Sequence, residues 1–189
     1  MSLVFIHGAG ATSDTFNYIK RDIASGIDLS YSNDNGFKNN LDLMLEKLKT
    51  VENIFFIAHS LGGVYALHLA GLIPNQVLGA VTMSTPYGGS EAADYVRLML
   101  PNSKLLQDIG PNSWPIAQVS KIELKHPWCN IVTVKGQNPF MLEPNDGVVS
   151  IASQRARRDM ELIEIGINHY EVVLSPRVVK IIKEKINKE

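Results

Sequence analysis

The chain has 189 residues, of which 45% are hydrophobic and 20% are charged, a composition typical of a single globular domain with a substantial core. The formal net charge of −1 argues against broad attraction to nucleic acid or to an anionic membrane. A single cysteine, Cys129, excludes an internal disulfide, and its place before an apolar run predicts a buried bystander.

The sequence begins Met-Ser-Leu-Val-Phe-Ile-His-Gly, which lacks the basic start and the long apolar stretch of a signal peptide. No apolar run in the sequence approaches the roughly 20 residues of a membrane span. We therefore expect a soluble, cytoplasmic protein. The five histidines are too few and too scattered for a metal-binding tract, so no metal site is expected.

The first half of the chain alternates short apolar runs with helical patterns. The run 54–58, Ile-Phe-Phe-Ile-Ala, is the clearest strand because it is continuously apolar, as a strand buried on both faces should be. Apolar residues at 41, 44, 45 and 48 recur at helical spacing. In chain order, the expected elements are a strand at 3–6, one or two helical turns at 16–23, a weaker strand at 27–31, a helix ending near residue 50, the strand 54–58 and a helix at 61–73.

The second half of the chain continues this alternation after one irregular stretch. Residues 101–128 contain four prolines and are expected to be irregular. In chain order, the expected elements are a strand at 77–83, a helix at 91–100 closed by Pro101, the irregular stretch, strands at 131–134 and 161–165, and an amphipathic helix at 178–186.

Six strands with helical crossovers predict a mostly parallel sheet covered by helices on both faces. The expected fold class is thus a three-layer α/β/α sandwich, with residues 1–189 forming one domain. Residues 88–128 follow a strand, and we expect them to lie over the functional site as a partial cap.

The segment Ala58-His59-Ser60-Leu61-Gly62-Gly63 joins an expected strand directly to an expected helix. A serine on such a tight turn projects its hydroxyl above the sheet, where it can act as a nucleophile. The backbone packs closely two residues before and after the serine, so small residues are needed there; Ala58 replaces the usual glycine, and Gly62 keeps it. The Leu61 N–H begins the helix and is expected to donate to an oxyanion. The alternative interpretation is that the motif is a strand-to-helix turn in which the serine has no catalytic role.

A second small-residue loop, His7-Gly8-Ala9-Gly10, follows the first strand. Such a loop can direct a backbone N–H toward the serine, and we expect Ala9, with Gly10 as the alternative, to be the second oxyanion donor. The other interpretations are a plain loop or a phosphate-binding turn. A dinucleotide motif requires G-x-G-x-x-G, but position 13 is serine, so nucleotide binding is disfavoured.

A serine nucleophile needs a base, and the base needs an orienting acid. His169 follows the last expected strand and is the expected base. Asp146 follows the strand 131–134 by a loop and is the expected acid, with Asp159 and Glu143 as rivals. The remaining histidines are expected to have structural or surface roles, and the side chain of His59 is expected to point away from the site; they are His7, His59, His68 and His126.

Four segments resemble the compact bacterial lipases and esterases of the α/β-hydrolase superfamily. The segment at 84–90 is informative, because lipase-like members often carry Thr-Pro-His-x-Gly-Ser at this place, and Tyr87 replaces the histidine of that pattern. The segments are Phe-Ile-His-Gly-Ala-Gly at 5–10, Ala-His-Ser-Leu-Gly-Gly at 58–63, Ser-Thr-Pro-Tyr-Gly-Gly-Ser at 84–90, and Asn-Asp-Gly-Val-Val at 145–149 with Asn-His at 168–169; residues 108–113 also resemble a downstream segment of these enzymes.

The resemblance implies a chain order of Ser60 as nucleophile, Asp146 as acid and His169 as base, with Ala9 and Leu61 as oxyanion donors. Members of the family usually have two more strands before the first one seen here. The chain is therefore similar to minimal, largely lidless lipases, for which interfacial activation and long-chain triglyceride preference are not expected.

The expected function is hydrolysis of a carboxylic ester through an acyl-enzyme on Ser60, without a cofactor. The expected partner is a small-molecule or lipid ester. Phe16, Tyr87 and the segment 98–116 are expected to line the acyl pocket. A thioesterase, amidase or acyltransferase would use the same triad, and a non-catalytic binding module is the alternative from another class.

Overall fold

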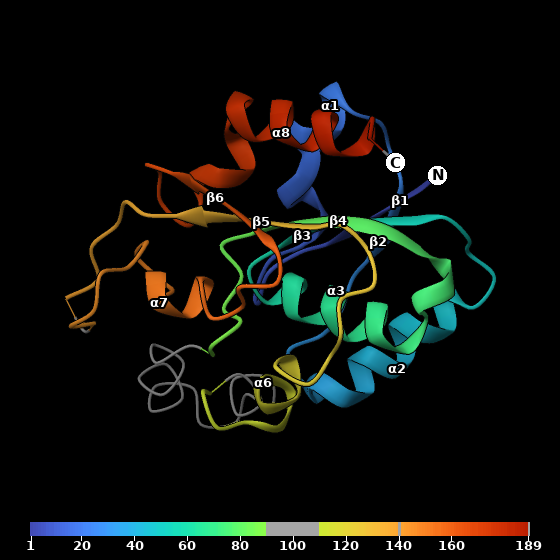
Figure 1. The fold of residues 1–189 in the computed structure, drawn as a ribbon, viewed down its shortest axis with the longest axis horizontal. Helices are drawn as coiled ribbons and strands as arrows, with labels where there is room; N and C mark the ends of the chain where they lie inside the picture. The colour runs from blue at the N-terminus through green and yellow to red at the C-terminus, as the bar shows by residue number, and fades with distance from the viewer. Residues whose placement is uncertain (90–109, 140, 189) are drawn as a thin grey trace.

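The computed structural model describes residues 1–89, 110–139 and 141–188 and contains one sheet of six parallel strands (Figure 1). The strand order across the sheet is β2-β1-β3-β4-β5-β6. The predicted α/β fold class is confirmed. The strands are β1 Ser2–Ile6, β2 Ile27–Leu29, β3 Ile54–His59, β4 Val77–Met83, β5 Trp128–Thr133 and β6 Glu161–Ile165.

The chain changes direction across the sheet between β1 and β3. From β1 it first adds β2 on one side and then returns to place β3 on the other side of β1, after which β4, β5 and β6 follow outward in order. In open parallel sheets, ligands bind beyond the carboxyl ends of the strands at such a switch point. The loop 7–10 follows β1 and Ser60 follows β3, so both expected oxyanion donors and the expected nucleophile lie at this point.

Helices cover both faces of the sheet (Figure 1). Helices α1 (Asn17–Asp22) and α8 (Pro176–Ile186) lie over one face, whereas α2 (Gly36–Leu48) and α3 (Leu61–Leu72) lie over the other. Alternate residues of each strand point to opposite faces, so Val4 packs in the apolar cluster with α2 and α3, and Phe5 packs in the cluster with α1 and α8. Every helix in the described part of the chain is too short or too polar to cross a membrane.

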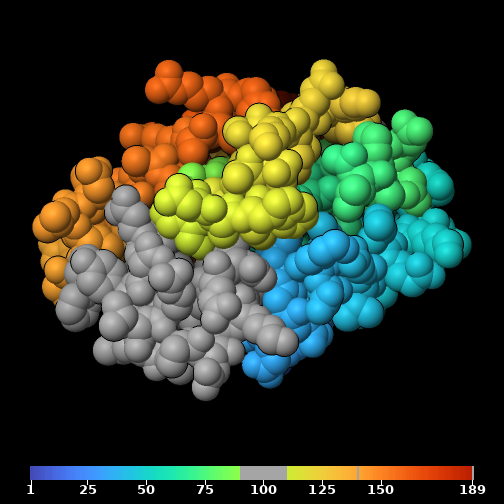
Figure 2. Space-filling model, turned by 90° about the horizontal axis from the view of Figure 1, so that it is seen from below, coloured from blue at the N-terminus to red at the C-terminus, as the bar shows by residue number. Residues whose placement is uncertain are grey.

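The prediction that residues 101–128 are irregular is wrong for residues 114–119. Helix α6 (Trp114–Val119) forms there, and Pro115 lies in its first turn, where the missing N–H of proline costs no helical hydrogen bond. Figure 2 shows this segment (yellow) on the surface beside α2 (blue). The expected helix 91–100 and most of the predicted cap 88–128 lie outside the described residues, so the capping role stays a prediction.

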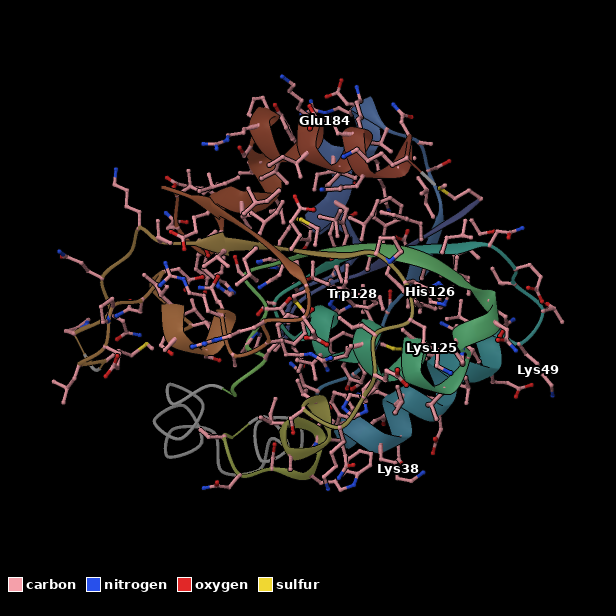
Figure 3. All side chains as sticks on the ribbon, in the orientation of Figure 1. Lys38, Lys49, Lys125, His126, Trp128 and Glu184 are labelled. Atoms are coloured by element: carbon pink, nitrogen blue, oxygen red, sulfur yellow. The ribbon has the colours of Figure 1, made fainter. Side chains whose placement is uncertain are left out.

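Strand β5 begins at Trp128, three residues before the predicted start at 131. The sequence pattern misled because Asn130 interrupts the apolar run. Asn130 is fully buried, but its side chain accepts a hydrogen bond from Thr82 Oγ1 and donates one to the carbonyl oxygen of Gln154, both at 2.9 Å. Figure 3 labels Trp128 on the α3 side of the sheet. The short helix α7 (Ile151–Gln154) was also not predicted.

Candidate active site

Ser60 stands on the turn that joins β3 to α3, with φ 53° and ψ −127°. This left-handed conformation is strained for a residue with a side chain and persists only where neighbouring groups hold it. The Ser60 N–H donates to the Met83 carbonyl oxygen at 2.8 Å, and the Gly63 N–H donates to the Ser60 carbonyl oxygen at 2.9 Å. A Cβ at Gly62 would lie 2.1 Å from the Ile6 carbonyl oxygen, so only glycine fits this turn.

The two expected oxyanion donors flank Ser60. Leu61 is the first residue of α3, and the loop of Ala9 packs against the turn, since a Cβ at Gly8 would lie 3.1 Å from Ser60 Cβ. The alternative donor, the Gly10 N–H, instead approaches Asn33 Oδ1 at 3.4 Å. Among hydrogen bonds between described residues, none uses the N–H of Ala9 or Leu61. Binding of an oxyanion by these two N–H groups stays a prediction.

Asp146 and His169 lie together, as predicted, although they come from separate loops after β5 and β6. His169 Nδ1 lies 2.8 Å from Asp146 Oδ2, and the His169 N–H donates to the Asp146 carbonyl oxygen at 3.0 Å. Both side chains are buried. A carboxylate can only accept, so Nδ1 carries the proton and Nε2 is left with a lone pair in neutral His169. This is the tautomer that a general base requires.

The two rival acids do not reach a histidine in this way. Asp159 instead pairs with Arg157, and its side chain is half exposed. Glu143 is exposed. The geometry therefore favours Asp146 among the three candidates.

The carboxylate of Asp146 is held ionised by its surroundings. Burial raises its pKa, but the hydrogen bond and electrostatic attraction of His169, the hydroxyl of Thr133 and the N–H of Val149 outweigh burial and leave the pKa below its usual value. Asp146 Oδ1 accepts from the N–H groups of Val148 at 3.0 Å and Val149 at 2.8 Å. These two bonds direct Oδ2, and not Oδ1, toward His169.

His59, which precedes Ser60, is directed toward His169, whereas the sequence led us to expect that it points elsewhere. Its Nε2 donates to the His169 carbonyl oxygen at 2.9 Å, and the two ring centroids are 4.9 Å apart. Its Nδ1 is buried and has no partner among the described residues. Burial, and next the neighbouring His169 ring, lower the pKa of His59 to about 3. His59 therefore stays neutral and ties the His169 loop to the Ser60 turn.

No hydrogen bond within the described residues joins the Ser60 hydroxyl to the His169 ring. Catalytic hydrogen bonds are often long before substrate binds. His59, which precedes Ser60, nevertheless connects the Ser60 turn to the His169 loop.

Phe16 and Tyr87 were expected to line the acyl pocket, but both are core residues, 0% and 2% exposed. The Phe16 ring packs on Phe5 with centroids 5.3 Å apart. The Tyr87 hydroxyl lies 2.9 Å from both Thr82 Oγ1 and Trp128 Nε1, and burial raises its pKa to about 12. These contacts give a ligand-binding role no support, and that role stays a prediction.

The remaining histidines have structural contacts. Within the described residues, no group of three or more His, Cys, Asp or Glu side chains is arranged to hold a metal ion. His7 stacks on Tyr31 with ring centroids 4.4 Å apart, His68 Nε2 lies 2.9 Å from the Pro115 carbonyl oxygen, and His126 Nε2 lies 2.7 Å from that of Pro74.

No protein-family model matches the sequence, and no curated protein matches it significantly. Among solved structures, the mature form of the Bacillus licheniformis lipase BlEst2 is similar with a TM-score of 0.78 and 13% identity, over 98% of this chain and 91% of that one. A metagenomic carboxyl esterase is similar with a TM-score of 0.78 and 15% identity, over 100% of this chain and 76% of that one. A hydrolase from Oleispira antarctica is similar with a TM-score of 0.66 and 11% identity, over 100% of this chain and 91% of that one. At these identities the likeness concerns architecture, and the chain has the α/β-hydrolase fold.

Proposed function

We propose that the protein is a serine hydrolase that cleaves carboxylic esters through an acyl-enzyme on Ser60. The observation that carries this proposal is the buried Asp146–His169 pair, 2.8 Å apart, which His59 joins to the strained turn of Ser60. The names of two similar structures, a lipase and a carboxyl esterase, support the ester class.

In the proposed mechanism, Ser60 Oγ attacks the ester carbonyl carbon while His169 Nε2 takes the hydroxyl proton. Asp146 holds the opposite ring nitrogen and stabilises the imidazolium. The N–H groups of Ala9 and Leu61 bind the developing oxyanion. When the tetrahedral intermediate collapses, His169 returns the proton to the leaving oxygen and the alcohol departs. A water, deprotonated by His169, then hydrolyses the acyl-enzyme and releases the acid and free Ser60.

Thioesters, amides and acyl acceptors other than water would use the same groups, because only the leaving group or the acceptor differs. A non-catalytic binding module would not require the Asp146–His169 hydrogen bond or the strained Ser60 turn. A substrate panel that includes a thioester and an amide, and an assay with an added alcohol as acyl acceptor, therefore separate the enzymatic alternatives from the ester hydrolase.

Hydrolysis of p-nitrophenyl esters from acetate to palmitate tests the proposal. Ser60→Ala is expected to lower kcat by about 10⁴-fold to 10⁶-fold, as in other serine triads. Ser30→Ala, at an exposed position between β2 and α2, is the matched control and should keep full activity. Ser60→Ala with nearly full activity would overturn the serine mechanism. No turnover of any ester by the wild type would overturn the ester class.

A further inference from the structure

Ser84 follows β4 at the same end of the sheet as Ser60 and is also strained. Its φ is 53°, and it is fully buried. A residue with a side chain keeps this conformation only where its neighbours hold it. The Ser84 N–H donates to the Ile131 carbonyl oxygen at 2.9 Å, and its hydroxyl lies 2.8 Å from Thr133 Oγ1. The strained backbone thus places a hydroxyl beside the last residue of β5.

The direction of the hydrogen bonds that start at Ser84 follows from their chemistry. Thr133 Oγ1 lies 2.6 Å from Asp146 Oδ2, and an ionised carboxylate can only accept. Thr133 therefore donates its one hydroxyl proton to Asp146. The Thr133 oxygen is then left as an acceptor, so Ser84 donates to it. The result is a chain of donors that runs from Ser84 through Thr133 to the carboxylate.

Gln154, the last residue of α7, is the second group that holds this carboxylate. It is fully buried, and its Nε2 donates to Asp146 Oδ2 at 3.1 Å and to the Thr133 carbonyl oxygen at 3.2 Å. Its Oε1 accepts from the Thr133 N–H at 2.9 Å. Only this orientation of the amide satisfies all three partners, because two are acceptors and one is a donor. The side chain is therefore locked between β5 and the carboxylate.

We propose that Ser84, Thr133 and Gln154 are positioning residues that fix the Asp146 carboxylate toward His169. This inference rests on the proposed function, in which Asp146 orients the base. With backbone N–H groups on Oδ1 and three donors on Oδ2, the carboxylate cannot rotate without breaking several buried hydrogen bonds. The Thr133 bond is also among the groups that lower the Asp146 pKa.

Thr133→Val removes the donor while keeping the shape of the side chain, and Thr133→Ser keeps the donor. Thr82→Val is the matched control, because Thr82 is an equally buried β-strand threonine whose hydroxyl bonds Asn130 and not Asp146. We expect Thr133→Val to lower kcat by about 10-fold to 100-fold with KM unchanged, the effect of losing a hydrogen bond to a charged group. Thr133→Ser is expected to stay within about threefold of the wild type.

The pH profile of kcat/KM distinguishes positioning from packing. Loss of the Thr133 donor leaves more negative charge on the Asp146 carboxylate and so changes the coupled Asp146–His169 pair that sets the acid side of the profile. That side should shift to higher pH in Thr133→Val and not in Thr82→Val. Wild-type kcat and pH profile in Thr133→Val would overturn the inference, and so would an equal loss in Thr82→Val. If Thr133→Val does not fold, Ser84→Ala provides the same test, with a smaller shift in the same direction.

A spectroscopic measurement separates failure of this inference from failure of the proposed function. The proton that His169 Nδ1 donates to Asp146 is expected to give a downfield proton resonance, assigned by its loss in His169→Gln. Its position should change in Thr133→Val and stay unchanged in Thr82→Val, whether or not any ester is hydrolysed. A wild type that turns over no ester would refute the proposed function alone, whereas an unchanged resonance in Thr133→Val would refute the positioning role.

Discussion

His59→Gln is expected to make the protein less sensitive to acid. The folded state holds His59 neutral, with its pKa lowered from 6.5 to about 3, whereas in the unfolded chain the imidazole takes up a proton below about pH 6.5. Above pH 6.5, His59 therefore does not reduce the free energy of unfolding. As pH falls from 6.5 toward 3, that free energy decreases because only the unfolded chain binds the proton. Each pH unit in this window costs about 1.4 kcal/mol, so roughly 2 kcal/mol is lost between pH 6.5 and pH 5.

Urea unfolding of wild type and His59→Gln at pH 7.5, 6.5, 5.5 and 5.0 measures this difference. Glutamine can still donate to the His169 carbonyl oxygen but does not titrate. The other buried histidines lower the free energy of unfolding of both proteins equally at acid pH, so their contributions cancel in the difference between wild type and His59→Gln. Thr82→Val, which removes a buried hydroxyl and no titrating group, should stay parallel to the wild type at every pH. Equal pH dependence in His59→Gln and wild type would refute the argument that burial keeps His59 neutral.

Three further outcomes follow from packing and burial. Gly62→Ala places a Cβ 2.1 Å from the carbonyl oxygen that ends β1, and urea unfolding should show a loss of about 2 kcal/mol or more; an unchanged midpoint would contradict the tight turn. Gly136→Ala places a Cβ 2.3 Å from the Asp146 carbonyl oxygen, so melting temperature and ester turnover should fall together, while Gly166→Ala, with open space around it, should change neither. Burial raises the pKa of the Cys129 thiol to about 12, and Ellman's reagent should label it only on unfolding; rapid labelling of the native protein would show that the thiol is accessible.

The strands could be predicted from the sequence because parallel strands covered on both faces are mostly continuous apolar runs. The expected run 77–83 agrees residue for residue with β4, which is such a strand. The run 161–165 also agrees residue for residue with β6, although β6 is an edge strand that carries two exposed glutamates. The start of β5 was missed because its polar residue, Asn130, is satisfied by side chains and backbone from distant segments. A local pattern contains no information about such partners.

The chain order and strand-end positions of Ser60, Asp146 and His169 were sufficient to predict that the acid and the base meet. The surrounding polar groups could not be predicted in this way. Thr133 and Gln154 lie in an apolar strand and in an unpredicted helix, and neither belongs to a motif. The contact of His59 with His169 depends on how two loops pack, which no single-sequence signal reports.

Mass spectrometry after reaction with a fluorophosphonate probe tests the serine mechanism most directly, because it requires no knowledge of the natural substrate. We expect one covalent adduct, located on the peptide that contains Ser60, absent in Ser60→Ala and strongly slowed in His169→Gln. An unlabelled wild-type protein, or an adduct at another residue with Ser60→Ala still active on esters, would contradict Ser60 as the nucleophile.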